Sequence, residues 1–320
     1  MKVPRTPIFI ILCALALLVA STTLAAGPLP SQDDIIHGAQ LYDSWFAVLG
    51  VEPPVGNMPI WSRQTTNTRS GPVTWRCNEC HGWDYRGQDG EYRAGSHFTG
   101  FPDIYTLVQG LTEDEIVNHL NGNLDPAHNF SAYLDPTSLT QLAEFLKYGI
   151  IDDSVYINPI SLRVLNPDIN HGQQLYLSTC LNCHGENGQK IVLDIEGINE
   201  YLGSLANRDP WRFLHRTRFG VAGTDMPVGL SLGWVLEDGR DVLAYAQTFP
   251  TGGELLGEPT ANPQGTPAPL IGGPAHNLWT GILTGLGTIG GALLVSAAFI
   301  VGFVLMSFII VFILRKRTRH

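Results

Sequence analysis

The sequence predicts an all-α protein with two small helical domains in tandem and a C-terminal transmembrane helix. Three observations lead to this prediction. A helical pattern occurs twice along the chain, no alternating strand pattern of convincing length is present, and residues 277–314 carry no charged side chain. A bilayer core needs about 20 apolar residues, so this uncharged stretch is long enough to span one.

The first 26 residues have the pattern of a secretory signal peptide. Lys2 and Arg5 precede an apolar run from Ile8 to Ala20, and small residues follow as far as Ala26. This order of charge, apolar run and small residues is typical of a cleaved export signal. We therefore expect residues 1–26 to be removed during export, with an uncleaved N-terminal anchor as the alternative.

The C-terminal region predicts a linker, a membrane span and a basic tail. Residues 250–277 are rich in Pro and Gly, which favours an extended linker. Residues 278–314 form the expected span, and 315–320 hold four basic residues. Because such residues stay in the cytoplasm, we expect a single-pass protein of a bacterial inner membrane with its domains on the periplasmic or outer face. G-x-x-x-G spacings in the span permit contact with another membrane helix; they involve Gly281, Gly285, Gly287 and Gly291.

The part of the chain between signal and span is strongly acidic. The signal and the tail hold six of the 19 basic residues, so 13 basic residues stand against 29 acidic ones and the formal charge is −16. Such a charge argues against nucleic acid as a partner and favours partners with a positive surface.

A duplicated segment marks the two domains. HGAQLY at 37–42 returns as HGQQLY at 171–176, and each copy leads to a pair of cysteines and then to a second helical stretch, at 138–148 and 235–248. We expect domain 1 at 27–155 and domain 2 at 156–249. Domain 1 holds about 30 extra residues before its cysteines, roughly 46–73, whose Pro, Gly, Thr and Trp content is typical of a long loop.

The cysteines carry the chemical signal. Four lie in the expected mature chain, in CNECH at 77–81 and in CLNCH at 180–184. Four cysteines in an exported protein suggest two disulfides, but a histidine follows each pair directly. Two thiols one helical turn apart with an adjacent histidine form the attachment motif of a c-type haem. A zinc site on the two pairs is the competing interpretation, and it leaves both histidines without a role. The predicted attachment residues are Cys77, Cys80, His81, Cys180, Cys183 and His184.

The second copy resembles a class I cytochrome c domain. After the attachment motif come TDMP at 224–227 and a closing helix with Tyr245. In that family a Met-Pro about forty residues after the motif supplies the sixth iron ligand, and Met226 lies 42 residues beyond His184. The resemblance covers about residues 34–249 and implies a tandem diheme cytochrome with two covalently bound haems c, ligated in domain 2 by His184 and Met226.

The first copy departs from that family because no methionine follows its motif within the domain. In the first copy, LDPAH at 124–128 corresponds to the position of Met226. The neighbouring histidines support this alignment, because His119 stands about ten residues before His128 and His215 about ten before Met226. His128 is therefore the predicted sixth ligand of haem 1, beside His81. His97 and Met58 remain alternatives, as does an open site.

Other residues are expected around the haems. Four aromatic side chains are expected to pack there, and three arginines are candidates to pair with haem propionates. His119 and His215 are expected on helices beside the haem edges, without an iron. The aromatic residues are Trp75, Trp83, Tyr85 and Trp211, and the arginines are Arg76, Arg216 and Arg218.

The resemblance implies electron transfer to or from a redox protein or a membrane respiratory complex. A thioether ligand raises the potential of a haem relative to a second imidazole, so electrons would enter at haem 1 and leave from haem 2. An electron carrier is favoured over an enzyme. The alternative is a diheme peroxidase-like protein or another haem oxidoreductase, since the spacing of His97 after His81 is reminiscent of the diheme peroxidases.

Overall fold

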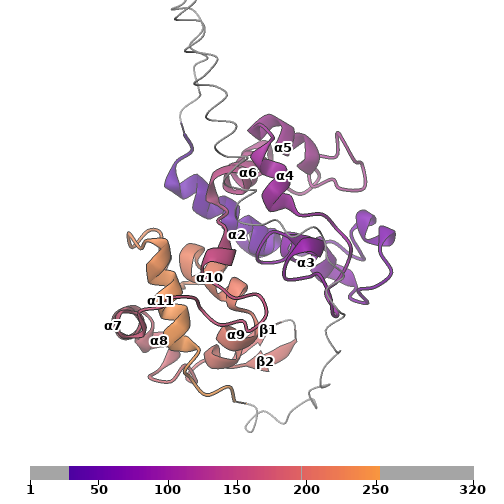
Figure 1. Ribbon diagram of the computed structural model, residues 1–320. Coiled ribbons are helices and arrows are strands. Elements are labelled where there is room, and N and C mark those ends of the chain that lie inside the picture. The colour runs from indigo at the N-terminus through magenta and orange to yellow at the C-terminus, as the bar shows by residue number, and fades with distance from the viewer. Residues whose placement is uncertain (1–28, 196, 253–320) are drawn as a thin grey trace, which may run out of the picture. The chain divides into compact units, whose positions relative to one another are not determined.

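A computed structural model describes residues 29–195 and 197–252, which belong to one compact unit. The first half holds α2 (Gln32–Leu49), α3 (Cys77–His81), α4 (Ile104–Gln109), α5 (Glu113–Leu120) and α6 (Pro136–Glu144). The second half holds α7 (Ile169–Thr179), α8 (Leu181–His184), α9 (Leu202–Arg208), α10 (Pro210–Phe219) and α11 (Leu236–Ala246). The two sets of helices form separate groups in Figure 1.

Short helical turns fill the connections. Within the expected loop lie the 3₁₀ turns η1 (Pro59–Arg63) and η2 (Gly71–Trp75), and α2 runs on to Leu49 before the loop begins. Further 3₁₀ turns are η3 (Gly87–Asp89) and η5 (Asp153–Val155), and α6 continues as a π-helical turn, η4 (Phe145–Gly149). The helical stretches expected at 138–148 and 235–248 are therefore confirmed, as α6 with η4 and as α11.

In each half, the first helix packs across the last helix, and the two backbones meet at a glycine of the first helix. A Cβ on Gly38 would lie 2.1 Å from the Gln141 carbonyl oxygen, and a Cβ on Gly172 would lie 1.9 Å from that of Asp241. Only glycine permits two helix backbones to approach this closely. The glycine shared by HGAQLY and HGQQLY thus makes the same crossing in both copies.

The tyrosine of the same motif makes a second shared contact. Tyr42 donates a hydrogen bond of 2.6 Å to the Gly82 carbonyl, and Tyr176 donates one of 2.6 Å to the Gly185 carbonyl. Each glycine directly follows the C-x-x-C-H motif of its own half. The first helix is therefore tied both to the closing helix and to the cysteine segment, so the sequence repeat is a structural one.

A small sheet corrects the all-α prediction. β1 (Leu193–Ile195) and β2 (Ile198–Glu200) pair antiparallel, with Leu193 opposite Glu200. At their turn, Gly197 has a φ of +82° and donates a 2.8 Å hydrogen bond to the Asp194 carboxylate. Strands of three residues are too short to give a recognisable alternating pattern.

The membrane part of the predicted fold class finds no support in the described residues. Across residues 29–195 and 197–252, no helix combines the length and the apolar character needed to cross a membrane. The span predicted at 278–314 lies outside the described residues, as do the signal at 1–26, the tail at 315–320 and most of the linker at 250–277. The described fold is helical with one small sheet.

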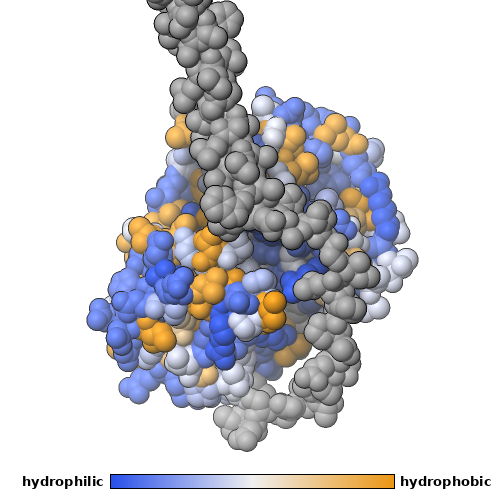
Figure 2. Space-filling model, in the orientation of Figure 1, coloured by the Kyte–Doolittle hydropathy of each residue, from blue (hydrophilic) through white to orange (hydrophobic). Residues whose placement is uncertain are grey.

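The two halves meet along one face of α2. Arg216 of α10 binds the buried Asp43 carboxylate at 3.1 Å, and Arg76 binds the same carboxylate from the residue before the first cysteine. His215 contacts the Ala39 carbonyl at 3.1 Å. Hydrophilic and hydrophobic side chains are interspersed over the coloured part of the face in Figure 2.

Candidate haem sites

The first cysteine pair lies on α3, a single short helix anchored to α2. The Asn78 amide donates hydrogen bonds to the carbonyls of Tyr42 and Asp43, at 3.1 and 2.8 Å. After His81 the chain turns at Gly82, whose φ is +73°. Cys77, Cys80 and His81 consequently project from one anchored turn.

His81 and His128 face each other, although 46 residues separate them in the sequence. Their ring centres lie 6.4 Å apart, and the ring planes are inclined by 83°. His81 Nδ1 contacts the Pro102 carbonyl at 3.2 Å, and His128 Nδ1 contacts the His119 carbonyl at 2.9 Å. Because each Nδ1 is occupied by a backbone acceptor, each ring is set to present Nε2 to a ligand.

This spacing fits two axial ligands of one metal. An imidazole nitrogen binds a transition metal at about 2.0–2.1 Å and lies roughly 1.1 Å from its ring centre, so two trans imidazoles have ring centres about 6.3 Å apart. Among the described residues, no three His, Cys, Asp or Glu side chains are grouped to hold a bare metal ion. A haem iron needs only two protein ligands, because the porphyrin supplies four.

A cavity of about 430 Å³ contains this histidine pair. Most of its wall is aliphatic and aromatic, as a site for a flat apolar macrocycle requires. Cys77 and Cys80 line it together with both histidines. The apolar lining comes chiefly from α4, α5 and α6 with its π-helical turn, and consists of Tyr42, Ile60, Phe101, Pro102, Ile104, Leu107, Val108, Leu111, Ile116, Leu120, Phe130, Leu142 and Leu146.

Burial changes the acid–base properties of these groups. It lowers the pKa of His81 to about 4, with a smaller contribution from His128, and it lowers the pKa of His128 as well. Both rings are therefore neutral near pH 7, as metal ligands must be. Burial raises the pKa of the Cys77 thiol to about 12, whereas dithiol oxidoreductases lower the pKa of a reactive cysteine.

The extra loop of domain 1 supports the His128 segment. The Ile60 amide donates a 3.1 Å hydrogen bond to the Ala127 carbonyl. Arg63 binds the Asp125 carboxylate through two hydrogen bonds, and Asp125 in turn accepts one of 3.0 Å from the Ala127 amide. Sequence reasoning missed Arg63 and Asp125. The only signal was that the insertion occurs in the copy that lacks the ligand methionine.

The two alternative ligands of domain 1 lie elsewhere. His97 Nε2 contacts Arg69 at 2.8 Å, and the ring stacks on Tyr92 at 4.6 Å between centres. Met58 is a buried core residue, 3% exposed. Neither residue lines the cavity that holds His81 and His128.

The second cysteine pair is more open. Cys180 is partly buried, Cys183 is exposed, and burial raises the pKa of the Cys180 thiol to about 11. Within the described residues, the buried Nδ1 of His184 has no hydrogen-bond partner. The motif has the same local form as the first, with α8 following Cys180 and ending at Gly185 in a positive φ of 78°.

Met226 lies on the loop after α10. Its amide donates a 3.3 Å hydrogen bond to Thr224, and its carbonyl lies close to Gly220, beside Gln40 of α2. No hydrogen bond within the described part of the chain joins Met226 to His184. Met226 as a ligand of the second iron therefore remains a prediction from the sequence.

The residues expected beside the haems lie at the junction of the two halves, at a second cavity or in the buried core. Arg76 and Arg216 are engaged by Asp43, whereas Arg218 lines a different cavity. Tyr85 contacts His215 Nδ1 at 2.8 Å, so both ring nitrogens of His215 are occupied. The four aromatic residues expected near the haems, Trp75, Trp83, Tyr85 and Trp211, are all buried.

No protein-family model and no curated protein matches this chain.

Proposed function

We propose that the chain is an electron-transfer protein with two covalently bound haems that works outside the cytoplasmic membrane. The observation that supports this most is the spacing of His81 and His128, whose ring centres are 6.4 Å apart inside an apolar cavity that Cys77 and Cys80 also line. Covalent attachment sites, an axial pair and an apolar wall are the three features that a bis-histidine c-type haem requires.

In this proposal each motif attaches its cofactor through two cysteines and one histidine, and the second iron ligand differs between the two sites. Cys77 and Cys80 would attach haem 1 covalently, and His81 and His128 would ligate its iron. Cys180 and Cys183 would attach haem 2, and His184 and Met226 would ligate its iron. The haem iron supplies a centre that takes up and releases one electron.

The difference between the two ligand sets would set the direction of electron transfer. The carbonyls of Pro102 and His119 hold the two imidazoles of haem 1 in place, and a second imidazole lowers the potential relative to a thioether. Electrons would therefore enter at haem 1 and leave from haem 2. The excess of acidic residues favours a redox protein or membrane respiratory complex with a positive docking surface.

The experiment is a haem count on the purified full-length protein after denaturation and acid–acetone extraction. Two haems should remain with the polypeptide, and one should remain in the Cys77→Ala/Cys80→Ala variant or in the Cys180→Ala/Cys183→Ala variant. Fewer than two haems in the wild type would overturn the proposal. A fast turnover of hydrogen peroxide by the two-haem protein would point instead to an enzyme.

A further inference from the structure

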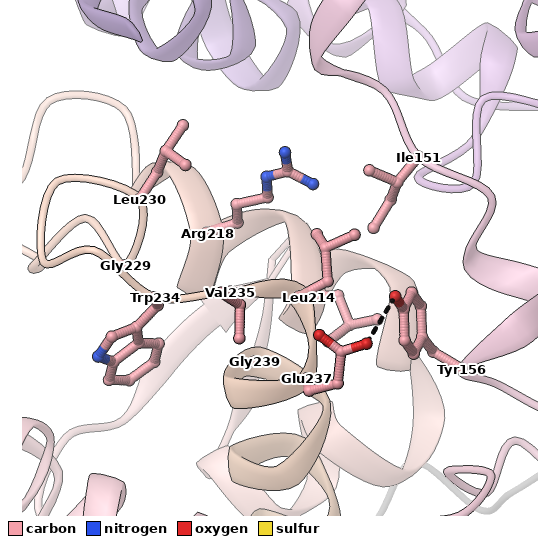
Figure 3. A pocket seen from close by; sticks show the side chains of 11 residues that line it. Ile151, Tyr156, Leu214, Arg218, Gly229, Leu230, Trp234, Val235, Glu237 and Gly239 are labelled. Atoms are coloured by element: carbon pink, nitrogen blue, oxygen red, sulfur yellow. Dashed lines mark hydrogen bonds between the residues drawn. The ribbon is translucent and has the colours of Figure 1, made fainter.

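A second cavity, of about 340 Å³, lies in the other half of the protein, among α10, α11 and the segment before domain 2 (Figure 3). None of the residues proposed to attach or ligate a haem lines it. Its size is within the range of small-molecule sites. The wall is mainly apolar and includes Ile151, Leu214, Leu230, Trp234, Val235 and Leu236.

Arg218 is the basic residue of this cavity, and Figure 3 shows its side chain on the side opposite Trp234 and Glu237. Its Nε and Nη1 atoms are buried, and neither has a hydrogen-bond partner among the described residues. Arginine stays charged in proteins. Arg218 as a whole is partly buried, and its guanidinium also packs over the Phe219 ring at 5.0 Å. Two buried N–H groups without an acceptor are unfavourable, so these nitrogens favour an anionic acceptor in the cavity.

The nearest acidic groups do not supply that anion. Glu237 lines the cavity but accepts a hydrogen bond from the Tyr156 hydroxyl, at 3.4 Å (Figure 3). Asp153 is buried, and its Oδ1 atom also lacks a partner among the described residues. Burial raises the pKa of Asp153 well above its ordinary value, which makes this carboxyl a poor counterion.

We propose that this cavity binds an organic monocarboxylate, with the carboxylate on Arg218 and an apolar body against Leu214, Leu230 and Trp234. Glu237 on the same wall disfavours a second negative charge on the ligand. The same carboxylate chemistry is carried by a free small acid and by a propionate of a bound haem. The proposal goes beyond the electron-transfer function.

Calorimetric titration of the purified full-length protein with benzoate tests the carboxylate contact, with benzyl alcohol as the neutral probe. A charged hydrogen bond in a buried site changes affinity about tenfold or more. We expect benzoate to bind at least about tenfold more tightly than benzyl alcohol, and Arg218→Gln to abolish that difference. Equal affinities of the two probes for every form of the protein would overturn the proposal.

An exposed residue of the wall gives a second measurement that does not depend on changing a buried group. Val235 lines the cavity and is 62% exposed, so Val235→Glu and Val235→Lys should both fold. The first should weaken benzoate binding and the second should strengthen it, with benzyl alcohol unaffected. Leu232, 53% exposed and outside the cavity, provides the control, and Leu232→Glu should change nothing. An equal effect at both positions would contradict a local site.

The Cys180→Ala/Cys183→Ala variant distinguishes the two sources of the carboxylate. Benzoate binding to the wild type supports a free acid as the occupant. Binding to this variant alone supports a haem propionate on Arg218, and binding to neither form overturns the site. The affinities are measured independently of haem content, so failure here is distinguishable from failure of the proposed function.

Discussion

Arg216 Nε lies 3.1 Å from the Asp43 carboxylate, and this ion pair joins α10 to α2 across the junction of the two halves. Asp43 is 1% exposed and also binds Arg76, the residue that precedes the first cysteine. One buried carboxylate therefore connects the second half of the protein to the first attachment segment.

Replacing Asp43 by Asn should destabilise the protein strongly. Removing one partner of a buried ion pair costs about 3–5 kcal/mol, because the remaining charges lose their counterion. Here two arginines would be left, and the free energy of unfolding from urea titration measures the loss. Asp89→Asn, at an exposed position, is the control and should have little effect.

The same carboxylate predicts an acid-dependent part of the stability. Burial alone would raise the pKa of Asp43, but Arg216 and Arg76 outweigh it and lower the pKa from 3.8 to about 2. A lowered pKa stabilises the folded state above the unfolded pKa, and this stability is lost as the pH falls through the folded pKa. About 2 kcal/mol should therefore disappear between about pH 4 and pH 2. If wild type and Asp43→Asn lose stability equally over this interval, the predicted shift is wrong.

Substitution of the axial histidine tests the assignment of haem 1. His128→Met should raise the potential of that haem, because a thioether replaces an imidazole. Met226→His should lower the potential of haem 2 for the same reason. A redox titration with low-temperature spin resonance reports both potentials and both ligand sets. His97→Ala should leave both spectra unchanged, since His97 contacts Arg69 and Tyr92. A high-spin haem 1 in His97→Ala would contradict the assignment.

Arg63 should determine how firmly His128 is held. Arg63→Ala removes the ion pair to Asp125, which lies at the surface and therefore contributes only modestly. Carbon monoxide binding to reduced haem 1, limited by dissociation of His128, should become modestly faster. The Arg208 side chain is about as exposed as that of Arg63 and forms an ion pair with the buried Glu200, so Arg208→Ala is the control for loss of an exposed arginine. Equal rates in wild type and Arg63→Ala would show that the loop does not support His128.

The glycine crossings predict a steric effect. A Cβ at Gly172 would overlap the Asp241 backbone at 1.9 Å, so Gly172→Ala should lower the free energy of unfolding by about 2–3 kcal/mol. Gly239 offers the contrast within α11, because its nearest neighbour would lie 3.6 Å from a new Cβ. Gly239→Ala should be neutral or stabilise by up to about 1 kcal/mol. Thermal and urea unfolding measure both variants, and similar losses in the two would contradict the crossing.

The local features of this protein follow from sequence patterns. The repeat of HGAQLY and HGQQLY identifies the duplication, and C-x-x-C-H predicts two attachment motifs, because both depend on spacings within one or two helical turns. The positions of the closing helices followed from apolar periodicity for the same reason. The short strands were missed because three residues carry too little pattern.

Only the tertiary structure brought together residues that are distant in the chain. His81 and His128 face each other because the carbonyls of Pro102 and His119 orient their rings, and no spacing rule encodes that contact. Arg63 reaches Asp125 across 62 residues, and Arg216 reaches Asp43 across 173. That two buried nitrogens of Arg218 have no partner within residues 29–195 and 197–252 depends likewise on which side chains surround them after folding. Such relationships arise from the packing of whole helices, whereas sequence patterns report the local geometry of each element.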